Sequence, residues 1–148
     1  MYEGVEVLRI RREMPVVLWV SRHPILPAES EELHRIFREF VFLEYREPVE
    51  VRKNSDFLEL IRNVRPDVIV AVVPLSVMAK LLEIREEYGF ELWRPTMEEV
   101  RVSDLPDHDE ECEVAMPLKG GQYKIYRFKH FSRVREIKVV EEPIGVTE

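Results

Sequence analysis

Short apolar runs alternate along the chain with segments whose apolar positions repeat at helical spacing. Four runs are typical of strands, and the first and third are apolar enough for burial on both faces. These runs are 16–20, 41–45, 67–73 and 90–93. Three other segments place apolar residues on one helical face, at i, i+3, i+4 and i+7 in the first two, which predicts amphipathic helices. These segments are 27–40, 55–65 and 74–88.

Residues that favour helix ends support these boundaries. Pro27 stands where the first turn of a helix tolerates proline, and Asn54 or Ser55 can cap the second helix. Gly89 follows the third helix, at a place where a left-handed residue is favoured.

The alternation of strands and helices over 14–93 predicts a parallel sheet covered by helices on both faces. We expect a Rossmann-like or flavodoxin-like α/β fold with strand order 2-1-3-4, because the first and third strands are the most apolar and belong in the middle. We expect a single domain over 1–148, with an α/β core at 14–102 and a C-terminal extension at 103–148.

The extension is expected to hold an acidic loop and a basic β-hairpin. The hairpin would pair 114–118 with 123–131, and the two glycines at 120–121 would supply the positive φ of its turn. Residues 133–140 are a candidate last strand, and residues 4–12 are a candidate strand before the core.

Composition narrows the class of protein. The net charge of -7 argues against a generally basic nucleic-acid binder. The single cysteine, Cys112, excludes an internal disulfide. No apolar run approaches the ~18–20 residues of a membrane span, so we expect a cytoplasmic protein. One glutamine and two asparagines against 22 basic and 29 acidic residues favour a thermophilic source, with archaea among the candidates.

The expected topology points to a ligand site. Open parallel sheets bind ligands beyond the carboxyl ends of their strands, where the strand order reverses, which here lies between the first and third strands. Hydroxyl groups, cationic side chains and helix N-termini at this edge suit a phosphate or carboxylate. We therefore expect a nucleotide or another anionic small molecule as ligand. The candidate binding residues are Ser21, Arg22, His23, Ser76, Arg94 and Thr96.

Common phosphate-binding motifs do not occur at this edge. The chain contains neither G-x-G-x-x-G nor G-x-x-x-x-G-K-[ST], and Pro24 and Pro27 stiffen the turn where a phosphate loop uses glycine. No cofactor is therefore assigned. The alternative interpretation is that Ser76 only caps a helix and that Arg22 and His23 are ordinary polar loop residues.

The pair Arg22-His23, directly after an apolar strand, resembles the opening of the histidine phosphatases over about six residues. That resemblance implies a phosphate-ester hydrolase in which His23 is the phosphoryl acceptor. Pro24 replaces the glycine of that family. The family also uses a second histidine after an apolar strand, and none of the other histidines follows one. These are His34, His108 and His130.

A basic stretch at 119–138 contrasts with the acidic remainder of the chain, since it holds seven basic residues and one acidic residue. A basic strip with an exposed aromatic suits single-stranded nucleic acid, which is the alternative function. Pairing with 113–118, or with a second subunit of a homo-oligomer, would instead neutralise the strip. Five strip residues would share one face at a two-residue period. They are Arg127, Lys129, Phe131, Arg133 and Arg135.

The acidic loop at 103–113 contains one histidine and one cysteine among acids. Zinc sites show paired spacings such as C-x₂-C, which this loop lacks, so no metal site is expected.

The sequence VVLWVSRHP at 16–24 and the helix start after it resemble small uncharacterised Rossmann-like proteins of thermophilic prokaryotes and their mobile elements. The resemblance covers roughly 14–95, implies no activity and transfers no functional residue. The leading interpretation is a small α/β binding or regulatory protein.

Overall fold

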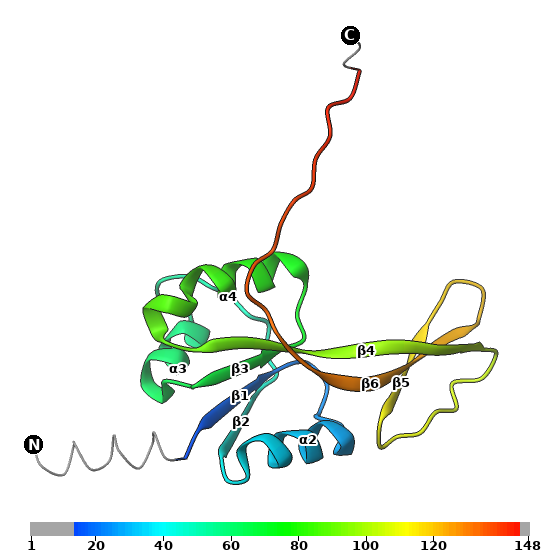
Figure 1. Ribbon diagram of the computed structural model, residues 1–148, viewed down its shortest axis with the longest axis horizontal. Coiled ribbons are helices and arrows are strands. Elements are labelled where there is room, and N and C mark those ends of the chain that lie inside the picture. The colour runs from blue at the N-terminus through cyan, green and yellow to red at the C-terminus, as the bar shows by residue number, and fades with distance from the viewer. Residues whose placement is uncertain (1–13, 146–148) are drawn as a thin grey trace, which may run out of the picture.

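The computed structural model describes residues 14–145, so the candidate strand at 4–12 lies outside the described residues. Strands and helices alternate through the first part of the chain, and three strands without helices follow (Figure 1). The elements are β1 (Val16–Val20), α2 (Pro27–Phe37), β2 (Val41–Tyr45), α3 (Asp56–Val64), β3 (Val68–Ala71), α4 (Leu75–Tyr88), β4 (Glu91–Ser103), β5 (Glu113–Pro117) and β6 (Tyr123–Arg133). None of the described helices is long and apolar enough to cross a membrane.

The six strands within residues 14–145 belong to one mixed sheet with the order β2-β1-β3-β4-β6-β5. The first four pair in parallel, in the expected order 2-1-3-4. The protein is therefore α/β, but a purely parallel, flavodoxin-like sheet is wrong as a description of the molecule. The C-terminal hairpin adds β6 to the free edge of β4 in the antiparallel direction, and β5 to β6.

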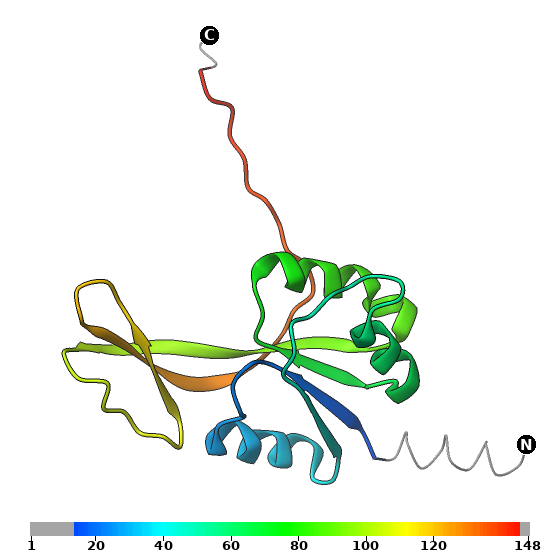
Figure 2. The ribbon, with the colours of Figure 1, turned by 180° about the vertical axis from the view of Figure 1, so that it is seen from behind.

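Helices cover both faces of the parallel strands. Helices α3 and α4 lie on one face, where Phe57 and Leu81 pack against Leu18 and Ile69. Helix α2 lies on the other, where Leu33 packs with residues of β1, β3 and β4 that include the two tryptophans (Figure 2). Every residue of β1 and β3 is buried as a result, which explains the unbroken apolar runs in the sequence.

The helix ends follow the signals in the sequence. Pro27 opens α2, where a missing N–H costs no hydrogen bond. Ser55 caps α3, because its Oγ accepts a hydrogen bond from the Leu58 N–H at 3.3 Å. Gly89 ends α4 with φ of +74°, and its N–H donates to the Arg85 carbonyl.

Strand β4 is much longer than expected, because it continues through Pro95 to Ser103. Its outer part leaves the core and, together with β5 and β6, forms a projection that we call the arm, residues 96–128 (Figure 1). The expected hairpin at the end of the arm is confirmed, with positive φ at both glycines of its turn, 120–121.

A bulge interrupts the alternation expected along β6. Phe128 pairs with Met97 and His130 pairs with Thr96, so Lys129 is an extra residue without a partner on β4. The residues after Lys129 consequently point to the opposite side from the one that a two-residue period predicts.

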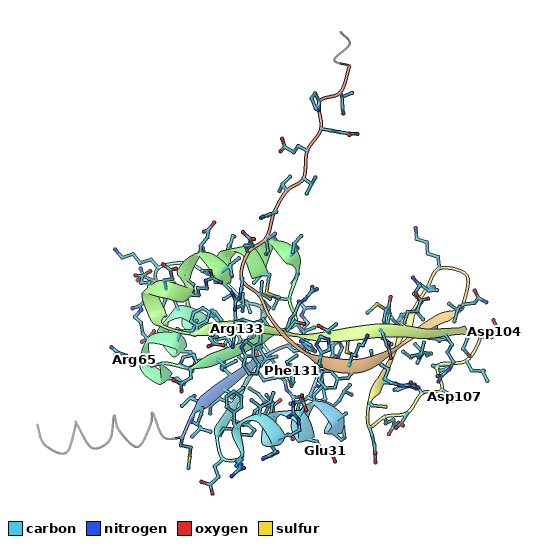
Figure 3. All side chains as sticks on the ribbon, in the orientation of Figure 1. Glu31, Arg65, Asp104, Asp107, Phe131 and Arg133 are labelled. Atoms are coloured by element: carbon cyan, nitrogen blue, oxygen red, sulfur yellow. The ribbon has the colours of Figure 1, made fainter. Side chains whose placement is uncertain are left out.

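The bulge decides where Phe131 lies. Its ring centroid is 5.0 Å from that of Phe128, and it packs against both Trp19 and Trp93, with centroids at 6.3 and 6.1 Å. Figure 3 shows Phe131 in the packed centre of the molecule. The prediction of an exposed aromatic ring on one face with Arg127 is therefore wrong.

Strand β6 ends at Arg133, so the candidate last strand at 133–140 is wrong too. Arg133 pairs with Trp93, and β4 begins shortly before that residue, at Glu91. Strand β4 therefore offers almost no partners to residues after Arg133. The Val134 N–H still donates to the Leu92 carbonyl, and the described chain then runs away from the sheet without regular secondary structure (Figure 1).

Candidate ligand-binding groove

A groove of about 560 Å³ lies beyond the carboxyl ends of β1, β2 and β3. Its volume falls in the usual range of small-molecule sites. Ser21, Arg22 and His23 line it from the segment after β1, and Glu47 lines it from the segment after β2. The remaining wall is apolar. It consists of Val20, Pro48, Val49, Val72, Val73, Pro74, Val77 and Met116.

Ser21 fixes the backbone that carries Arg22 and His23. It is buried, its N–H donates to the Tyr45 carbonyl at 3.2 Å, and its Oγ accepts from the His23 N–H at 3.1 Å. The indole N–H of Trp19 donates to the His23 carbonyl at 3.3 Å. His23 is thus held at both of its backbone polar groups. Its side chain and that of Arg22 are exposed and line the groove.

The charges that line the groove are not neutralised by neighbours. Among residues 14–145, Arg22, His23 and Glu47 make no ion pair and no side-chain hydrogen bond to another side chain. Among the residues that the structure describes, Ser21 is the only hydroxyl side chain that lines the groove, and its oxygen accepts the His23 N–H. The lining residues therefore offer polar binding groups rather than an activated nucleophile.

Three of the predicted site residues do not line the groove. Arg94 and Thr96 lie within β4, because that strand does not end at Trp93 as expected. Arg94 is exposed, and the Thr96 hydroxyl is hydrogen-bonded to that of Ser132 on β6. Ser76 is exposed in the first turn of α4. The structure thus brings together only the candidates that follow β1.

Glu47 and Met116 were not predicted as site residues. Glu47 could have been found, because it lies two residues beyond β2, the strand next to β1, and so reaches the same edge. Met116 comes from β5 on the arm, and nothing in its local sequence indicates that the arm turns toward the groove.

The N-terminus of α2 was expected to contribute backbone N–H groups to an anion. Instead, the Ala28 N–H donates to the Glu111 carbonyl at 2.9 Å. The Leu26 N–H donates to the Glu29 carboxylate at 2.8 Å. The acidic loop and the helix itself therefore use these donors. Glu29 is only 4% exposed, and burial raises the pKa of its carboxyl group to about 7 against the hydrogen bond from Leu26, which lowers it.

Cations of the predicted nucleic-acid strip are paired with acids on neighbouring strands. Arg133 contacts Glu91 at 2.8 Å, and Lys129 contacts Glu98 at 3.9 Å. Arg135 has no ion pair within residues 14–145. The described contacts therefore favour internal neutralisation of the strip over nucleic-acid binding.

The remaining cation of the strip, Arg127, belongs to a cluster around Glu113. This carboxylate is buried, and it contacts the guanidinium groups of Arg127 at 2.9 Å and Arg101 at 3.2 Å. It also accepts from the Asp109 N–H at 2.9 Å. The Asp109 N–H, followed by the two arginines, lowers the pKa of Glu113 to about 2 despite desolvation.

The acidic loop shows no metal site in the part of the chain that the structure describes, where no three metal-ligating side chains form a group. Figure 3 places Asp104 and Asp107 at the outer end of the molecule, on the arm. Lost hydration and the nearby Asp109 carboxylate raise the pKa of the Cys112 thiol, which disfavours a nucleophilic role.

Comparison with known proteins found no matching family model, no matching curated protein and no matching solved structure.

Proposed function

We propose that this protein is a small α/β binding or regulatory protein that takes a nucleotide or another phosphate-type anion in the groove beyond β1 and β3. One observation carries the proposal. Arg22 and His23 line the groove without an ion-pair partner among the described residues, whereas Arg127, Lys129 and Arg133 on β6 all have one. An unpaired guanidinium group and an imidazole at the reversal of strand order are available to an anion.

The rest of the groove supports a ligand with an apolar portion. Its valines, prolines and Met116 form a wall that can cover a ring or chain attached to the anionic group. The rigid backbone around His23 supports binding as well, because a preorganised site loses less conformational entropy when it takes its ligand.

The proposal is tested by thermal shift with inorganic phosphate and the four ribonucleoside mono- and diphosphates. A ligand present at 100 times its dissociation constant stabilises the folded protein by about 2.7 kcal/mol, which shifts the melting temperature by several degrees. We expect such a shift for the wild type and its loss in Arg22→Ala.

Arg94→Ala is the matched control, since Arg94 is an exposed arginine that does not line the groove. It should leave the shift unchanged. Absence of a shift with every anion, or an equal loss in both variants, would contradict the proposal.

A further inference from the structure

Strand β2 ends the sheet with an edge that no strand within residues 14–145 covers. The N–H of Val41 and the carbonyl of Tyr45 are hydrogen-bonded to the segment that contains β1. Backbone groups alternate in direction along a strand, so those of Phe42 and Glu44 point out of the sheet. No described residue accepts a hydrogen bond from either of these two N–H groups. Donors and acceptors for a further strand therefore stand free along this edge.

The residues of β2 leave this edge open to another strand. Four of its five residues are apolar or aromatic, and Val41 is 38% exposed. Its one charged residue, Glu44, is paired with Arg46 at 2.7 Å. Proteins protect exposed edges with proline, bulges or unpaired charges, and β5, the strand at the opposite edge of the sheet, carries Pro117. Strand β2 has none of these protections, which favours pairing with a strand of another molecule.

A second copy of β2 fits this edge in one antiparallel register. Around a two-fold axis, residues whose backbone groups point outward must lie opposite one another, which leaves few registers. The register centred on Leu43 pairs every residue of β2. A register centred on Glu44 would place two like charges directly opposite each other. A register centred on Phe42 would leave the end of the strand opposite residues that precede β2.

The register centred on Leu43 also matches the side chains. Phe42 and Glu44 of the two copies would exchange N–H and carbonyl groups on both sides of the axis. Val41 would lie opposite Tyr45 of the second copy, and pairs of a β-branched and an aromatic residue stabilise antiparallel strands. Leu43 would meet its own copy at the axis. The strand is thus self-complementary in this register.

We propose that two copies of this chain form a symmetric dimer in which their β2 strands pair in the antiparallel direction across a two-fold axis at Leu43. The two sheets then become one continuous sheet. The partner is a second copy of the chain because β2 complements itself. This interface goes beyond the proposed function and does not depend on it.

The first experiment is analytical ultracentrifugation over a range of protein concentrations. The wild type is expected at twice the 17.7 kDa of the chain, and Glu44→Pro at the mass of the monomer. Proline removes an N–H that donates across the axis, whereas an edge strand tolerates proline where the N–H faces outward. Glu44→Ala is the matched control, because it removes the same side chain but keeps the N–H. It should stay dimeric.

A disulfide tests the register without relying on the folding of the proline variant. Opposite residues of a non-hydrogen-bonded antiparallel pair have Cα atoms about 4.5 Å apart, and a disulfide spans about 4.4–6.8 Å. Leu43→Cys, made together with Cys112→Ser, should therefore give a covalent dimer when copper phenanthroline oxidises the two thiols. Val102→Cys in the same background, at an exposed position of β4, is the control and should not cross-link.

Three results would each overturn the dimer. A wild type that sediments as a monomer at every concentration would contradict it. A dimer that persists in a folded Glu44→Pro, or a Leu43→Cys variant that does not cross-link, would place the interface elsewhere. Protection of the Glu44 amide from hydrogen exchange that does not change with protein concentration would show that the same chain covers this edge. Cross-linking at Leu43→Cys together with protection that rises with concentration would support it.

Discussion

Glu29 provides the sharpest test of the packing between α2 and the sheet. Its carboxyl group is 4% exposed, it faces the core from the first turn of α2, and its Oε1 accepts the Leu26 N–H at 2.8 Å. Glu29→Gln removes the charge and keeps an oxygen in the same place for that hydrogen bond. We expect this variant to be more stable than the wild type at neutral and alkaline pH.

The magnitude follows from the pKa, which burial raises from 4.5 to about 7. Because the folded state holds the proton more strongly than the unfolded state, the stability contributed by Glu29 is fully present below pH 4.5 and is lost as the pH rises through about 7. That loss is about 3 kcal/mol. The raised pKa already includes the favourable hydrogen bond from the Leu26 N–H, so the net gain of the variant is about 3 kcal/mol at pH 8.

The assay is urea denaturation followed by tryptophan fluorescence between pH 4.5 and 8, with the free energy of unfolding compared between wild type and variant at each pH. The difference should be small at pH 4.5 and level off above pH 7. Glu31→Gln, an exposed residue of the same turn, is the control and should show no such rise (Figure 3). A difference that does not change with pH, or a variant less stable than wild type at pH 8, would refute the reasoning.

Three further variants test other contacts. Ser21→Ala removes the acceptor of the His23 N–H and should cost about 1 kcal/mol in urea denaturation, together with a several-fold weaker affinity for the groove ligand in a fluorescence titration. In Gly89→Ala the added Cβ meets no atom within 4 Å, so the only expected cost comes from the left-handed φ of +74°. That cost is about 1 kcal/mol of folding stability and should be measured as a lower melting temperature. Glu113→Gln should lower the melting temperature at pH 7. Because the pKa of Glu113 in the folded state is lowered to about 2, its contribution to stability is present above pH 4.5 and is lost as the pH falls through 2. An acid titration followed by circular dichroism should therefore show a smaller pH-dependent loss of stability in the variant than in the wild type.

The parallel part of the fold could be predicted from the sequence, because burial on both faces of a strand produces a simple pattern of apolar residues. Strands β1 and β3 are covered on both faces and are apolar throughout, and Pro27, Ser55 and Gly89 occupy helix ends for local reasons. Each of these features depends on neighbouring residues or on a single period, which a sequence displays directly.

The antiparallel part could not be predicted with the same rules. Pro95 within β4 normally indicates the end of a strand, and the exposed arm mixes polar and apolar residues on both faces. The bulge at Lys129 depends on how β6 pairs with β4, and a single inserted residue reverses every later side chain, including Phe131.

The candidate groove was only partly predicted, because some of its expected residues depended on where β4 ends. Ser21, Arg22 and His23 follow a strand whose end was correctly expected, whereas Arg94 and Thr96 were assigned to the site on the assumption that β4 ends at Trp93. Met116 reaches the groove through tertiary structure that joins the arm to the core, and no local pattern carries that information.

The pairing of β6 along β4 has a consequence during synthesis on the ribosome. The parallel neighbours of β4 precede it in the chain, whereas the strand that covers its outer edge from Trp93 to Ser103 is not complete until Arg133. A nascent or stalled chain that stops before β6 therefore presents a long, unpaired strand edge to other chains. Completion of the C-terminal hairpin covers that edge of β4 with β6.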